Sequence, residues 1–171
     1  MLVVEEGEVM QQKFPKGMTI DTVFDKYSNT VYRLAYARVG NQYDAEDILQ
    51  TVFLKLCRAK MSFGDEEHLK AWLLKVTVNS SNNLLKSAWM RLTDALDSNI
   101  AVPVHEVSEV YSEVAKLPLK YRTVIHLHYY EGYSCAEIAD IVGSNEATVK
   151  TRLKRAREKL QNVLKGEEIN V

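Results

Sequence analysis

The spacing of glycine and proline restricts this chain to long helical segments. Among 171 residues there are seven glycines and three prolines, and no glycine lies between Gly64 and Gly132. Glycine and proline are the residues that most often interrupt helices and form turns. Apolar residues recur at intervals of three and four, whereas no convincing alternation typical of a β-strand is present. The sequence therefore predicts an all-α protein in two small helical domains.

The first domain is predicted over residues 19–92. One helix ends at Gly40, and Asp44 is expected to cap the next, with Asp47 three residues further on, because carboxylates suit the positive helix start. A loop over residues 60–65 precedes a third helix. The apolar faces of the three helices consist of Val31, Leu34, Ala35 and Val39; then Ile48, Leu49, Val52, Phe53 and Leu56; then Leu69, Trp72, Leu73, Val76 and Leu84.

Two segments differ from these helices in composition. Residues 93–115 contain five acidic residues, Pro103 and neither lysine nor arginine. This composition favours a flexible acidic linker over a packed element, although the second half of the segment is compatible with a helix. Residues 1–18 are assigned to an N-terminal tail.

The second domain is predicted over residues 116–171. Pro118 suits the first turn of a helix, and Ser134 with Glu137 forms a capping box at the start of another. Gly143 fits the residue after that helix, and Asn145 is the expected cap of the last one. A short helix, a glycine-containing turn and a longer helix form the helix-turn-helix layout.

The last helix is strongly basic on one side. Residues 147–165 carry seven basic side chains and one acidic one, a net charge of +6 in a chain whose total is −1. The face opposite its apolar line presents Ala147, Thr148, Thr151, Lys154 and Arg155, flanked by Lys150 and Arg152. Small residues, hydroxyl groups and long cations on one face suit a helix that lies in the DNA major groove. The alternative is an ordinary solvated basic helix.

Two polar faces in the first domain also allow a functional and a neutral interpretation. Leu54 lies beside Asp47, Gln50 and Thr51, which is consistent either with an incidental surface leucine or with a docking patch for a protein. The third helix combines aromatic, amide and cationic groups in Trp72, Lys75, Asn79, Asn82, Asn83 and Lys86. Such groups suit single-stranded bases, although a core tryptophan beside a polar face is the simpler interpretation.

Several function classes are disfavoured. Two cysteines are too few for a zinc framework, and His126 and His128 point to different helix faces, so no metal or cofactor is expected. No P-loop, nucleophile elbow or paired carboxylate motif is present, which predicts that the chain is not an enzyme. No apolar run is long enough to span a membrane, and acidic residues follow Met1 too closely for a signal peptide. A cytoplasmic protein is expected.

Three stretches resemble bacterial RNA polymerase sigma factors of the small extracytoplasmic-function (ECF) group of the sigma-70 family. Residues 31–39 with 44–56 resemble the polymerase-binding part of region two, and residues 71–79 (AWLLKVTVN) resemble its promoter-melting helix. Residues 117–122, 133–143 and 148–157 resemble region four. The order and spacing are those of the family, which implies a region-two bundle and a region-four helix-turn-helix.

The resemblance implies roles for three sets of residues. Asp44, Asp47, Gln50, Thr51 and Leu54 would bind the clamp helices of the polymerase β′ subunit. Phe63 and Gly64 would lie in the loop that captures a flipped base of the −10 element, and Trp72, Lys75, Asn79, Asn83 and Lys86 would line the melting surface. Thr148, Lys150, Thr151, Arg152, Lys154 and Arg155 would face the −35 element.

The resemblance also implies partners and a function. The partners are core RNA polymerase, through the β′ clamp helices and the β flap, promoter DNA and an anti-sigma factor. The chain departs from the family at Asn83 and Lys86, where Asp and Arg are frequent. The predicted function is to direct core polymerase to promoters and to help melt them; the alternative is a helix-turn-helix regulator that binds duplex operator DNA without polymerase.

Overall fold

Every regular element in the part of the chain that the structure describes is helical, which confirms the predicted all-α class. The computed structural model describes residues 13–15, 17–92 and 109–168. The first unit consists of α2 (Ile20–Val39), α3 (Gln42–Arg58) and α4 (Glu66–Leu92). The second consists of α5 (Glu109–Lys116), α6 (Leu119–Ile125), the π-helical turn η1 (His126–Tyr130), α7 (Cys135–Val142) and α8 (Glu146–Glu168). In these ranges no helix combines the length and apolar character needed to cross a bilayer.

Local sequence signals set the ends of the first helices. Thr19 caps α2, and Gly40 ends it in the left-handed conformation with a φ of 76°. The cap of α3 is Asn41 and not Asp44, so that prediction is wrong. The Asn41 side chain accepts a hydrogen bond from the Asp44 backbone N–H at 2.9 Å and donates one to the Asp44 carboxylate at 2.8 Å. Asp44 therefore lies in the first turn, where its charge still favours the helix dipole.

The core of the first unit forms where these three helices meet. The predicted residues Val31, Ala35, Ile48, Val52 and Leu56 are buried there, together with Leu69 and Leu73 of α4. Trp72, Val76 and Leu84, which were predicted on the same buried side of α4, are only partly buried at the margin of this core. The apolar periodicity therefore identified which helix faces pack together, but it predicted a wider buried face on α4 than the structure has.

The second unit has the predicted helix-turn-helix. Ser134 and Glu137 form the capping box of α7, and Gly143 ends that helix with a φ of 67°. Asn145 accepts a hydrogen bond from the Thr148 backbone N–H at 2.8 Å and so caps α8. Val149, Leu153 and Ala156 of α8 are buried, on the side opposite its basic face. Pro118 stands immediately before α6.

Helix α5 changes the predicted boundary of the linker. Residues 109–115 were assigned to the tether, but they belong to α5, whose Val114 is buried in the core of the second unit. The helix permitted in the second half of this segment is therefore present and packed. Residues 93–108 of the predicted tether lie outside the described residues.

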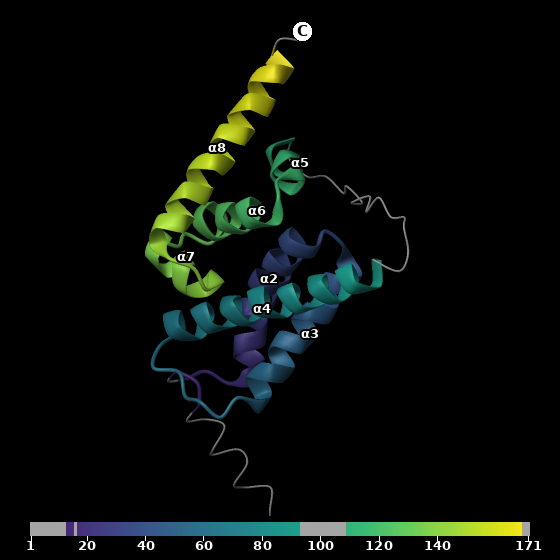
Figure 1. The fold of residues 1–171 in the computed structure, drawn as a ribbon. Coiled ribbons are helices and arrows are strands. Elements are labelled where there is room, and N and C mark those ends of the chain that lie inside the picture. The colour runs from purple at the N-terminus through teal and green to yellow at the C-terminus, as the bar shows by residue number, and fades with distance from the viewer. Residues whose placement is uncertain (1–12, 16, 93–108, 169–171) are drawn as a thin grey trace, which may run out of the picture.

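The two units pack against each other. Figure 1 shows α4 across the middle of the molecule, with α3 on one side, α6, α7 and α8 on the other, and α2 crossing behind α4 toward the second unit. Leu34, Leu74 and Val78 belong to the first unit but are buried in the apolar cluster of the second. Helix α4 therefore carries two apolar faces, because Leu69 and Leu73 face its own unit while Leu74 and Val78 face the other.

Arg38 makes the central polar contact of this interface. Its side chain is 4% exposed, and its guanidinium donates to Ser81 and Asn82 of α4 and to Thr123 of α6, each at 2.5 Å. Burial and the neighbouring Arg122 lower the pKa of Arg38 to about 10. The group thus remains charged at neutral pH while it links three helices.

Glu131 makes a second contact between the units. Its side chain is 4% exposed and lies 3.3 Å from Arg33 of α2 and 3.5 Å from Lys70 of α4. His126 Nε2 lies 3.6 Å from the same carboxylate. Burial favours the protonated acid, but the His126 ring and the two cations outweigh it and hold the pKa of Glu131 below its usual value.

Glu131→Gln is expected to loosen the packing between the two units. The amide cannot neutralise Arg33 and Lys70, so we expect the free energy of unfolding to fall by about 1–3 kcal/mol. This decrease is smaller than for a fully buried ion pair because Arg33 is half exposed. Because the folded pKa of Glu131 is depressed, its contribution is present at neutral pH and disappears as the pH falls through that value. Urea unfolding and the radius of gyration from small-angle scattering measure both effects.

Glu158→Gln is the matched control, because Glu158 pairs with Lys154 on an exposed surface. Its substitution should lower the free energy of unfolding by less than about 0.5 kcal/mol. An unchanged unfolding midpoint and radius of gyration for Glu131→Gln would show that this carboxylate does not hold the units together.

Candidate functional site

One exposed face of α3 carries the residues predicted to contact polymerase. Leu54 is 54% exposed, whereas Ile48, Val52 and Leu56 of the same helix are buried. Asp47 and Gln50 are exposed beside Leu54, and Asp44 and Thr51 are half-buried. The structure thus places this set on one side of the helix, directed away from the core. A large apolar side chain among carboxylate and amide groups is typical of a protein-docking surface.

The polar face of α4 is also on the surface. Lys75, Asn79, Asn83 and Lys86 are exposed. Between them, Ser80 and Ser81 are buried and accept hydrogen bonds from Lys55 and Arg38, respectively. The serines in this stretch therefore have structural partners, while the amides and lysines remain available to a ligand.

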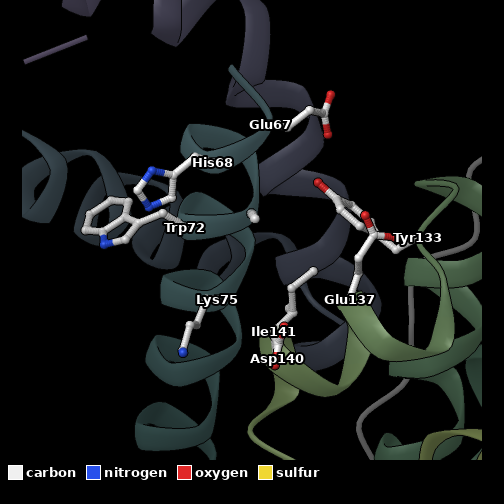
Figure 2. Close-up of a pocket in the computed structure, with 9 residues that line it drawn as sticks. Glu67, His68, Trp72, Lys75, Tyr133, Glu137, Asp140 and Ile141 are labelled. Atoms are coloured by element: carbon white, nitrogen blue, oxygen red, sulfur yellow. The ribbon is translucent and has the colours of Figure 1, made fainter. Parts of the chain in front are cut away.

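A cavity of about 300 Å³ lies between α4 and the second unit. Figure 2 shows that His68, Trp72 and Lys75 come from α4, while Glu137, Asp140 and Ile141 come from α7. Tyr133 also lines the cavity, and burial together with nearby carboxylates raises the pKa of its phenol. Helix α7 thus stands opposite the beginning of the predicted melting face, at Trp72 and Lys75.

The loop between α3 and α4 places its two predicted residues differently. Gly64 is exposed, and a methyl group added there would meet no atom within 4 Å. Phe63 is only 4% exposed, and its ring lies edge-on against Trp72 at a centroid distance of 5.5 Å. In this arrangement Gly64 lies open to a ligand, whereas Phe63 supports the loop from the inside.

Residues near the N-terminus, which were predicted to form a tail, hold this loop. The Phe14 ring is stacked parallel to Phe63 with centroids 6.4 Å apart, and the Phe63 backbone N–H donates to the Lys13 carbonyl at 2.9 Å. The Lys13 ammonium donates to the carbonyls of Leu56 and Cys57 at the end of α3. Only the apolar character of Phe14 could have indicated this contact.

The basic face of α8 is exposed, and its neighbour α6 adds groups that the periodicity of α8 does not reveal. A groove of about 500 Å³ brings together Thr148, Thr151, Arg152 and Arg155 of the predicted set. Lys120 and Tyr121 of α6 line the same groove. Lys150 and Lys154 are exposed outside it and pair with Glu146 at 2.6 Å and Glu158 at 4.0 Å. A helix face with paired hydroxyl and guanidinium groups can contact both phosphates and base edges.

Comparisons with known proteins agree with this division into two units. The sequence matches Sigma-70 region 2 over residues 23–91 and Sigma-70 region 4 over residues 108–160. It is 30% identical to the RNA polymerase sigma factor SigV of Bacillus subtilis, over 94% of this chain and all of the relative. It is 28% identical to the ECF RNA polymerase sigma factor SigW of the same organism, over 84% of this chain and 87% of the relative.

The chain belongs to the ECF group of the sigma-70 family. A solved structure with a similar fold is the sigma factor RpoE of Bartonella quintana in complex with the anti-sigma factor NepR. The TM-score is 0.74 at 23% sequence identity, over 85% of this chain and 96% of that one. The resemblance stated from the sequence is confirmed.

The family assignment gives the two units their names and the chain its function. The α2–α4 unit contains region 2 of this sigma factor, and the unit from α5 to α8 contains region 4. The chain directs RNA polymerase to promoters in transcription initiation. The match to region 2 disfavours the stand-alone regulator, because a helix-turn-helix that binds an operator by itself has no need of a polymerase-binding unit.

Phe14→Ala is expected to release the loop of residues 59–65 from region 2. Loss of the buried ring should cost about 3 kcal/mol of unfolding free energy, because it leaves a cavity against Phe63. We also expect faster hydrogen exchange at the Phe63 amide, which donates to Lys13. Tyr43→Ala is the control, since Tyr43 is 87% exposed and should change neither quantity. Unchanged exchange at Phe63 in Phe14→Ala would contradict the assigned contact.

Proposed function

We propose that three surfaces of this sigma factor contact different partners during transcription initiation. The exposed face of α3 binds the β′ clamp helices, and α4 with the preceding loop binds and melts the −10 element. The exposed face of α8 contacts the −35 element. The observation that carries the proposal is on α8, where Thr151, Lys154 and Arg155 are exposed while Val149, Leu153 and Ala156 are buried.

The proposed −10 surface rests on the amides and cations of α4. Lys75, Asn79, Asn83 and Lys86 follow one another at three- and four-residue intervals, so they share one side of the helix. Amides can form hydrogen bonds with the edges of unpaired bases, while lysines attract the phosphates. Gly64 lies open at the beginning of this surface, where the loop would accept a flipped base.

We infer that the packed arrangement of regions 2 and 4 is a resting state. Helix α7 stands opposite Trp72 and Lys75 across the cavity, so the beginning of the proposed −10 surface lies next to region 4, although Lys75 itself is exposed. Promoter DNA would require the two regions to separate, because −10 and −35 elements are distant along the duplex. Polymerase would hold the separated regions, with the β flap as the contact for region 4, and their linked binding then acts as one bivalent contact.

An anti-sigma factor would also stabilise such a resting arrangement. The RpoE structure with a similar fold contains the anti-sigma factor NepR. We propose that this chain also has an anti-sigma partner that stabilises a promoter-incompetent arrangement. The sigma factor would act in the cytoplasm, together with RNA polymerase, and would contribute recognition without catalysis of its own.

Run-off transcription with core polymerase across a promoter library tests the proposed function. We expect transcripts only when this chain, core polymerase and a matching promoter are all present. Tight and sequence-specific binding of the isolated chain to duplex DNA at physiological salt, without transcription in the complete mixture, would instead identify a stand-alone regulator.

Leu54→Asp is expected to weaken binding to core polymerase by at least about tenfold, because it places a charge at the centre of a desolvated interface. Helicity should be unchanged, since Leu54 is 54% exposed in the free chain. Met61→Asp is the matched control, because Met61 is also an exposed apolar residue but lies in the loop. Fluorescence titration against core polymerase measures the affinity; equal affinities for Leu54→Asp and wild type would refute the α3 assignment.

Arg155→Ala and Lys159→Ala are expected to affect promoter binding in different ways. Arg155 lines the groove beside α8, so its loss should cost about 1–3 kcal/mol and relax preference at one or two positions of the −35 element. Lys159 does not line that groove, and its loss should weaken binding evenly across sequences and lower the salt slope by about one unit. Promoter selection with the reconstituted holoenzyme at several salt concentrations separates the effects; identical sequence profiles for both variants would argue against base contact by Arg155.

A further inference from the structure

A pocket between the two regions is lined by cations without a carboxylate. Its volume is about 160 Å³, and its walls come from both units. Region 2 contributes Arg38 and Asn82, and region 4 contributes Lys120, Thr123 and Arg152. The remaining lining residues are apolar: Val78, Leu119, Val124 and Val142. The pocket therefore combines a strongly positive potential with apolar walls, which strengthen electrostatic attraction.

The charge of Arg38 has only neutral partners among the described residues. Ser81 and Thr123 present hydroxyl oxygens to its guanidinium, and Asn82 presents its amide oxygen. A guanidinium has five N–H groups, and these contacts use three of them. Two N–H groups and a full positive charge therefore remain on a side chain that is 4% exposed. A buried charge without a counter-charge is costly, so an anion at this place is favoured.

Lys120 and Arg152 supply two more charges. In the described ranges neither forms an ion pair, and the Lys120 ammonium lies over the Tyr121 ring at 5.1 Å. Two other cations of α8 differ, since Lys150 and Lys154 each have a glutamate one helical turn away. Lys120 and Arg152 therefore bring two positive charges without a counter-charge to the lining of the pocket.

We propose that this pocket binds a phosphate anion, as inorganic phosphate or pyrophosphate. Guanidinium and ammonium groups are the side chains that recognise phosphate oxygens, and Arg38 presents its N–H groups from a fixed position. The Asn82 amide nitrogen adds a neutral donor. The volume is several times that of one water molecule and suits a small anion, whereas it is too small for a whole nucleotide.

Binding at this pocket would stabilise the packed arrangement of the two regions. The lining residues come from both units, so the site exists only while they are packed together, and a ligand of one state shifts the population toward it. Lys120 and Arg152 also line the groove beside α8. A bound phosphate would therefore draw two cations away from the proposed −35 surface.

Isothermal titration calorimetry of the full chain with pyrophosphate at low ionic strength tests the proposal. We expect saturable binding of one anion per chain, weakened by about tenfold or more in Lys120→Gln and in Arg152→Gln, because each removes a charge-assisted contact. Lys60→Gln and Arg58→Gln are the matched controls, since both residues are exposed and outside the pocket, and their affinities should equal that of wild type. Circular dichroism checks that each variant is folded.

Two results would overturn the proposal. One is the absence of saturable binding of pyrophosphate and of inorganic phosphate; the other is a loss of affinity in the control variants equal to that in Lys120→Gln. A parallel titration with a short non-promoter duplex distinguishes the source of the phosphate. If the Lys120-dependent binding appears only with the duplex, the pocket belongs to nucleic acid contact and the free-anion site is refuted.

Discussion

The buried guanidinium of Arg38 is the contact on which the arrangement of the two regions depends. It is attached to α2 and donates to Ser81 and Asn82 of α4 and to Thr123 of α6. Thr123 and Ser81 in turn donate to backbone carbonyls of their own helices. Each hydroxyl therefore accepts a hydrogen bond from Arg38 and donates one to its own helix. A polar group buried at this depth stabilises one arrangement only when all of its partners are in place, which gives the interface geometric specificity.

Helix α4 connects that interface to the functional surfaces. Leu73 packs into the core of region 2, whereas the adjacent Leu74 packs into the cluster of region 4. The remaining side carries Lys75 and Asn79, which are exposed. Because one helix carries a core face, an interface face and the proposed −10 surface, a change in the packing of region 4 would alter the environment of the proposed −10 residues directly.

The contacts between the two regions are partly polar. The interface combines apolar side chains such as Leu74 and Val78 with buried charge, since the Glu131 carboxylate lies between Arg33 and Lys70. Interfaces of this kind are more polar than domain cores and can open when a competing partner offers equivalent contacts. In the proposed resting state, such a partly polar interface would allow the two regions to separate without unfolding either one.

Local signals in the sequence determined the helices, most of their caps and the basic face of α8, because a helix is specified by neighbours three and four residues apart. Such signals also placed Leu54 on the surface and Ile48 in the core. They could not predict the burial of Arg38, the pairing of Glu131 or the stacking of Phe14 on Phe63. The Arg38–Thr123 and Arg33–Glu131 contacts join residues 85 and 98 positions apart, and local periodicity contains no information about such pairs. The sequence by itself thus determined where each helix lies and which family the chain belongs to, while only the tertiary structure decided which helix faces pack together and which remain exposed.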